Sequence, residues 1–341
     1  MEAIWYGVIT ILLGTYVLLD GYDLGAGIAY ILYANNDEEK EKVVKSIRSV
    51  WDANEIWLLA FLVINYVVFP KYFTIFSTHF GGFFLLFFIF LLIKTLFFNL
   101  LSVFKNKPIL KNWTGYFFGL LNFVLAIFIS LIFANILRGV FLYDKSQSLH
   151  FVSKHFSPFS DYVGLFDWFT VIVSVLIFVG IMIHGLVWVI LKNSGAYTRK
   201  LKKIVQGLAL LELILIIAFL ISWYFLHPDI FDNYLTMPLL FIFPVLAFVS
   251  LFGLIGVRTY QGNNKGFILS TNLIIFSWIS IVIAMFPRFI MSLNEQELTA
   301  YNVDFDKPDR YYFEWWVFII AIFLLVYSII IHKYSKGNDL S

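Results

Sequence analysis

The chain is 341 residues long; 61% of them are hydrophobic, only 13% are charged, and the mean hydropathy is +0.85. Soluble domains are about half apolar and a quarter charged, so this composition excludes a soluble protein and indicates a polytopic membrane protein. The formal net charge of +2 gives no argument for nucleic-acid binding. The absence of cysteine excludes disulfides, thiolate metal sites and a cysteine nucleophile.

About nine apolar segments have the roughly 20 residues that a membrane-spanning helix needs. They lie near residues 4–32, 49–69, 79–104, 114–138, 162–191, 202–226, 236–257, 266–290 and 312–332. The N-terminus lacks the basic start of a secretory signal, so we interpret the first segment as a permanent span. The sequence therefore predicts an all-α integral membrane protein with about nine transmembrane helices.

Charge and a weak internal repeat suggest how these spans are organised. Most of the 24 lysines and arginines fall in the loops of one side, which predicts an outside N-terminus and a cytoplasmic C-terminus. Asp20-Gly21 in the first span and His184-Gly185 in the fifth are each followed by a charged cytoplasmic loop. We expect two four-helix transmembrane bundles, at 1–143 and 144–295, and a ninth helix with a cytoplasmic tail at 296–341.

The first span contains a polar island with two carboxylates, Asp20 and Asp23, on one helix face. Gly21 and Gly25 form a pair of small residues that would let another helix approach closely. One interpretation is packing, with the carboxylates bonded to a neighbouring helix. The other is a role in proton or ion movement, because carboxylates inside membrane spans are costly and are usually functional.

A second island, Asp52-Ala53-Asn54-Glu55, opens the second span between Trp51 and Trp57. Asp52 and Glu55 have the spacing of a helix capping box, and the two tryptophans would then be interfacial anchors. The depth of the two islands in the membrane suggests a second interpretation. The first span runs inward and the second returns, so the two islands would meet on the cytoplasmic side. Clustered carboxylates repel one another, and one of them can then carry a proton near neutral pH.

Histidine offers little sign of a cofactor site in this chain. Of the six histidines, only His184 lies deep in a predicted span. Such a residue is more often a hydrogen-bonded packing residue than a haem ligand, and no second histidine shares its face. Lys94, late in the third span, is expected to extend its ammonium group towards the membrane surface. No metal site is predicted.

The two islands resemble motifs of subunit II of the cytochrome bd quinol oxidases. Residues 19–27 read LDGYDLGAG, like the first-span motif, and residues 51–58 read WDANEIWL, like the family's W-D-G-N-E-x-W-L. Shorter matches follow at 69–72, 184–195 and 283–287. The chain departs from the family at 94–101, KTLFFNLL, where members usually carry R-G-x-x-x-E-[FY]-R.

The resemblance implies a nine-span, non-haem subunit in the bacterial cytoplasmic membrane, paired with a haem-bearing subunit I. That partner would carry two b-type haems, haem d and the quinol site, and the pair would oxidise quinol and reduce O2 to water with cytoplasmic protons. In some members subunit II contributes a proton route, an oxygen passage or a bound quinone. Asp52 matches the proton-route carboxylate, with Glu55, Asp20 and Asp23 as further candidates. The resemblance also includes small accessory subunits among the expected partners.

Two other function classes stay open from the residues alone. A secondary transporter would use the acidic pairs to coordinate ions near the middle of the membrane, and it predicts inverted repeats with broken helices. A purely structural assembly subunit predicts that neutralising every island carboxylate leaves oxidase turnover normal.

Overall fold

The computed structural model describes residues 2–48, 54–140, 167–260, 262–293, 297–301 and 326. Within these residues the chain is almost entirely helical. The long helices are α1 (Glu2–Leu32), α3 (Glu55–Val68), α4 (Pro70–Val103), α5 (Pro108–Arg138), α7 (Trp168–Lys192), α8 (Ala196–Leu226), α10 (Ile242–Ile255) and α11 (Asn264–Met285). Short elements join them: α2 (Asp37–Ile47), η2 (Pro228–Phe231), α9 (Asp232–Thr236), η3 (Pro238–Phe241) and η4 (Val257–Thr259).

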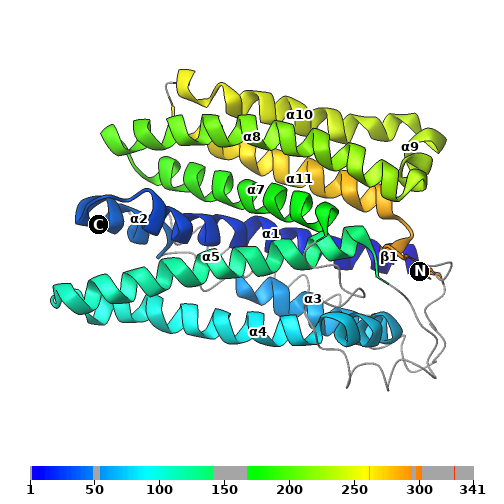
Figure 1. The fold of residues 1–341 in the computed structure, drawn as a ribbon, viewed down its shortest axis with the longest axis horizontal. Helices are drawn as coiled ribbons and strands as arrows, with labels where there is room; N and C mark the ends of the chain where they lie inside the picture. The colour runs from blue at the N-terminus through cyan, green and yellow to red at the C-terminus, as the bar shows by residue number, and fades with distance from the viewer. Residues whose placement is uncertain are drawn as a thin grey trace.

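The long helices run side by side along the longest axis of the molecule (Figure 1). Helices α7, α8, α10 and α11 lie on one side and α3, α4 and α5 on the other, with α1 between them. Helix α1 packs against α3, α5 and α7, and α7 packs against α8 and α11. The predicted boundaries near 143 and 295 lie outside the described residues, so the division into two four-helix bundles stays a prediction.

The predicted all-α membrane architecture is confirmed, whereas the count of nine spans is not. Seven helices of the described part are long and apolar enough to cross a membrane, or eight if one bent pair counts as a span. The predicted ninth span, near 312–332, lies outside the described residues except for position 326. The segments between predicted spans near 139–161 and 291–311 also lie largely outside them.

The bent pair shows how the chain passes from the predicted span near 49–69 to the one near 79–104. Helix α3 ends at Val68, and the chain turns by 119° into a helix that starts at Pro70. Proline cannot continue α3, because it lacks the N–H that the helix ladder requires, but it is well suited to the first position of a new helix. Residues 70–78, expected as a loop, are therefore the first turns of α4.

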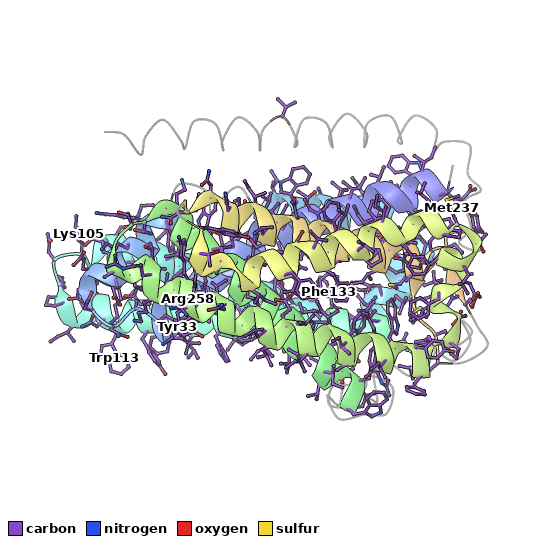
Figure 2. The ribbon with its side chains drawn as sticks, turned by 90° about the horizontal axis from the view of Figure 1, so that it is seen from above. Tyr33, Lys105, Trp113, Phe133, Met237 and Arg258 are labelled. Atoms are coloured by element: carbon purple, nitrogen blue, oxygen red, sulfur yellow. The ribbon has the colours of Figure 1, made fainter. Side chains whose placement is uncertain are left out.

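The two ends of the bundle differ in chemistry. Tyr33, Lys105, Trp113 and Arg258 lie towards one end and Met237 at the other (Figure 2). We call the former the basic end; there the Lys200 ammonium donates to the Tyr33 carbonyl over 2.6 Å. The opposite end is tied by the antiparallel strands β1 (Arg288–Ile290) and β2 (Leu298–Thr299), a small addition to the predicted all-α fold.

Glycines decide where α1 and α7 cross. A Cβ atom on Gly25 would lie 2.1 Å from the Ile181 carbonyl oxygen and 2.8 Å from the Gly185 Cα, and a Cβ on Gly185 would lie 2.1 Å from the Gly25 carbonyl carbon. The two backbones therefore touch directly at Gly25 and Gly185. Gly21 does not take part in this contact, because its Cβ would have only the His184 ring nearby, at 3.7 Å.

Candidate functional site

A group of charged side chains lies inside the bundle, where α1, α3 and α4 meet. We call Asp20, Asp23, Glu55 and Lys94 the buried charge cluster. At 1.5 Å per residue, Asp20 lies roughly 18 Å and Lys94 roughly 14 Å from the ends of their helices at the basic end. Glu55 reaches a comparable depth because α3 begins there, at an interior position. The structure thus brings carboxylates of both sequence islands together.

Lys94 connects the carboxylates of α1 and α3. Its Nζ lies 3.5 Å from Asp20 Oδ1 and 3.4 Å from Glu55 Oε1. The lysine side chain is 3% exposed and the Asp20 side chain 0%. The expectation that Lys94 extends towards the membrane surface is therefore wrong. Two acids from different helices surround the ammonium and stabilise it in the interior, which the sequence around position 94 could not reveal.

Asp23 is held by an amide from α3. Asn54 Nδ2 donates to Asp23 Oδ2 over 2.7 Å and to the Leu19 carbonyl over 3.1 Å. The same amide contacts the Tyr22 hydroxyl, at 2.9 Å from Nδ2. Asn54 is the N-cap residue of α3, yet its side chain makes no capping bond and faces α1 instead. This asparagine therefore ties the start of α3 to the first polar island.

Asp20 has a second partner that the sequence reasoning missed. The Tyr16 hydroxyl, one turn earlier on α1, donates to Asp20 Oδ2 over 2.8 Å. Tyr16 is buried, and the i, i+4 spacing of the two residues could have suggested this pair. Asp20 thus has a hydroxyl on one oxygen and an ammonium near the other.

The second island departs from its simplest interpretation. Asp52 and Trp51 lie outside the described residues, so their predicted roles stay predictions. Helix α3 begins at Glu55, with Asn54 as its N-cap residue. Trp57, expected as an interfacial anchor, is only 4% exposed and packs in the hydrophobic core. Its position follows from the inward-facing side of α3 and not from the membrane surface.

His184 is buried in α7 beside the glycine contact. Its Nε2 lies 3.1 Å from the Leu18 carbonyl oxygen and its Nδ1 2.9 Å from Ser270 Oγ. A carbonyl can only accept, so Nε2 carries the hydrogen and donates it to α1. The ring also stacks on Phe267, with centroids 5.3 Å apart. His184 therefore joins three helices, α1, α7 and α11.

The composition of the buried charge cluster favours the binding of a proton. It contains three carboxyl groups and one ammonium, so full ionisation would leave uncompensated negative charge away from water. Two like charges 4 Å apart interact by about 4 kcal/mol at an effective dielectric of 20, which favours binding of a proton by the group. The Tyr16 hydroxyl donates to Asp20 and the Asn54 amide donates to Asp23, so two of the carboxyl groups also have a neutral hydrogen-bond donor.

Comparison with known proteins gives this arrangement its context. The model of the family "Cytochrome bd terminal oxidase subunit II" matches residues 1–334. The chain belongs to this family. It is therefore a subunit of a bd-type terminal oxidase, a quinol:oxygen oxidoreductase of the bacterial respiratory chain, and the resemblance predicted from the two islands is confirmed. The transporter alternative is not favoured.

The relatives of this bd oxidase subunit are distant in sequence, but they match most of its length. It is 22% identical to a probable cytochrome oxidase subunit 2 of Haemophilus influenzae, over 98% of this chain and 94% of that protein. It is 24% identical to the cytochrome bd ubiquinol oxidase subunit 2 of Bacillus subtilis, over 86% and 82% of the two chains. The fold matches the bd oxidase structure from Geobacillus thermodenitrificans with a TM-score of 0.75 and 16% identity, covering 99% and 98%.

Membership in the bd family implies haem, so we tested whether the described residues suit an iron ligand. Both ring nitrogens of His184 already have hydrogen-bond partners. His227 Nε2 lies 2.8 Å from the Arg138 carbonyl oxygen and so donates to it. Within the described ranges, no three His, Asp or Glu side chains are grouped as a metal site would need. These residues do not fit a haem, and no step is assigned to one in this chain.

Proposed function

We propose that this subunit supplies protons to oxygen reduction through the buried charge cluster. In this proposal Asp20, Asp23 and Glu55 exchange a proton, and Lys94 compensates the charge that remains. The reduction of O2 to water consumes protons, and the oxidase must therefore deliver them to its oxygen site from one side of the membrane. The observation that carries the proposal is the position of Lys94 between Asp20 and Glu55.

The proposal places the oxygen chemistry in the partner. Haem b and haem d would be held by subunit I, and this chain would carry none. The lysine and arginine distribution supports a cytoplasmic basic end, which puts the N-terminus outside and the C-terminus inside the bacterial cytoplasmic membrane. Protons would then enter from the cytoplasm, where Asp52 is the expected first carboxylate. A bound quinone and accessory subunits stay predictions of the resemblance.

Glu55 is the expected point of transfer towards subunit I. Its side chain is 27% exposed on the isolated chain, whereas Asp20 and Lys94 are almost fully enclosed. A carboxyl group facing lipid at this depth is costly, so a protein surface is expected to cover it in the assembled oxidase. The partner subunit is the natural candidate, and a proton on Glu55 would lie at the boundary between the two chains.

The test uses the co-expressed two-subunit oxidase with Glu55→Gln, Asp20→Asn or Asp52→Asn in this chain. Each change keeps the shape of the side chain and removes its ability to exchange a proton. We expect quinol-driven O2 consumption to fall by roughly tenfold or more, which corresponds to about 1.4 kcal/mol in the barrier. The b and d haem bands should keep their intensity, since assembly is retained.

Glu38→Gln is the matched control. Glu38 lies on α2 at the basic end, is 76% exposed and pairs with Lys42 over 2.6 Å, so the same chemical change there should leave turnover normal. The competing interpretation is a purely structural subunit. Normal turnover after simultaneous neutralisation of Asp20, Asp23, Asp52 and Glu55 would support that interpretation and overturn the proton route.

A further inference from the structure

A second acid, Glu212, is buried in α8, which lies on the other side of α7 from α1 (Figure 1). It lies near the middle of α8 and is 6% exposed. The buried face of α8 is otherwise apolar around it, with Val205 and Ala209 before it and Phe219 after it. Neither the family motifs nor the proposed proton route uses this residue.

Helix α7 leaves room for the Glu212 carboxyl group without offering it a charge. A Cβ atom on Gly180 would lie 3.2 Å from Glu212 Oε1, so the missing side chain at 180 provides the space that this oxygen occupies. The other oxygen, Oε2, is buried and has no hydrogen-bond partner among the described residues. The carboxyl group therefore faces a neighbouring backbone across a glycine.

The elements packed against α8 provide no nearby cation. Helix α10 has no ionisable side chain, and η2 contributes Asp229, which pairs with Arg288. On α7, both ring nitrogens of His184 are engaged elsewhere, and Lys192 lies roughly 18 Å along the helix from Gly180. Arg258 of η4 donates to Gln206, roughly 9 Å along α8. No ion pair involves Glu212 in the part of the chain that the structure describes.

We propose that Glu212 is a proton-binding site of its own, which holds a proton at neutral pH and releases it only under alkaline conditions. An ionised carboxylate needs hydrogen bonds or a cation to offset the loss of hydration, and the described residues give Glu212 Oε2 no hydrogen bond and give the carboxyl group no ion pair. The neutral carboxylic acid needs far less compensation for its lost hydration. Glu212 lies on α8, whereas the charge cluster is formed by α1, α3 and α4, so this site is separate from the proposed route.

The direct test is infrared spectroscopy on the assembled oxidase at neutral pH, comparing the wild type with Glu212→Gln. We expect the wild type to show the C=O band of a protonated carboxyl group that shifts in D2O and is lost in the variant. Glu38→Gln, which removes an exposed and ion-paired carboxylate, should leave this band in place. Glu212→Met is a second variant without the acid, suited to the apolar surroundings. Wild-type and variant spectra without this difference would overturn the proposal.

A second measurement follows the thermal stability of the assembled oxidase with pH. Above the ordinary carboxyl pKa, the unfolded chain carries an ionised Glu212 while the folded chain must hold the acid neutral or bury a charge. The melting temperature of the wild type should therefore fall relative to that of Glu212→Gln or Glu212→Met as the pH rises above the ordinary carboxyl pKa of about 4.3. The gap should stop widening once the folded protein releases the proton. Parallel melting profiles for all three proteins would contradict a neutral Glu212. Neither result depends on whether the charge cluster carries protons.

Discussion

The buried charge cluster and the surroundings of Glu212 solve the same physical problem in different ways. Around α1, three carboxyl groups share one ammonium, one hydroxyl and one amide, so charge is compensated by groups from three helices. Around α8, a single carboxyl group has space beside Gly180 and no cation among the described residues. The first arrangement can tolerate ions, which suits the proposed proton route, whereas the second suits the proposed neutral acid. Burial alone therefore does not define a proton route.

The largest effect should come from removing the only ammonium of the charge cluster with Lys94→Met. The change leaves the buried Asp20 and the partly exposed Glu55 without their cation, and breaking a buried ion pair such as Lys94–Asp20 costs about 3–5 kcal/mol. We expect a low yield of assembled oxidase, measured from the haem bands of purified membranes. Asp20→Asn added to Lys94→Met should restore part of the yield, because one uncompensated charge is then gone. Full assembly of Lys94→Met alone would show that Lys94 does not balance the cluster.

The contact between the two halves can be tested with a pair of glycines on α1. Gly25→Ala would place a methyl group 2.1 Å from the Ile181 carbonyl oxygen, and since the obstacle is backbone it cannot easily move. We expect a loss of about 1–3 kcal/mol or more, measured as a lower melting temperature of the assembled oxidase. Gly21→Ala is the matched control, because its methyl group would have ordinary contacts at 3.7 Å. Equal effects of both changes would argue against direct backbone contact at Gly25.

His184 tests whether the second half has a structural or a cofactor role. His184→Leu removes the bonds to the Leu18 carbonyl and to Ser270, which should cost about 1–3 kcal/mol because polar groups lose their partners in the interior. Ser270→Ala removes only one of the two bonds of the His184 ring, together with the contact of Ser270 with the Phe267 carbonyl, and should cost less, about 0.5–1.5 kcal/mol. Both variants should lower the melting temperature and leave the haem spectrum unchanged. Loss of a haem band in His184→Leu, with the protein still assembled, would point to ligation instead.

The smallest effect concerns pH at the end of the bundle opposite the basic end. Burial lowers the pKa of His227 below its ordinary value of 6.5, and its ring donates to the Arg138 carbonyl. Since the folded state binds this proton more weakly than the unfolded state, stability should be complete above pH 6.5 and decline as the pH falls below it. In His227→Gln the melting temperature should decline less between pH 6.5 and the lower pKa. If the melting temperature of His227→Gln depended on pH in the same way as that of the wild type, His227 would not cause the loss of stability at low pH.

Some features of the site followed from local sequence alone. Asp20 and Asp23 share a face because they are three residues apart on a helix, and Glu55 reaches their level because α3 runs back beside α1. Lys94 was assigned to the membrane surface, because a lone lysine late in an apolar segment usually extends there. Tyr16 and Glu212 were not predicted as site residues, since neither belongs to a recognisable motif.

Composition and the two polar islands by themselves determined that this chain is a membrane-embedded helical bundle and a bd oxidase subunit II, because apolar length and local motifs are properties of adjacent residues. Tertiary structure alone decided that Lys94 compensates Asp20 and Glu55, that Gly25 meets Gly185, and that Glu212 has no cation within the described residues. The physical reason is that the energy of a buried charge depends on what other helices bring within a few ångströms of it, and the order of residues along one helix does not contain that information.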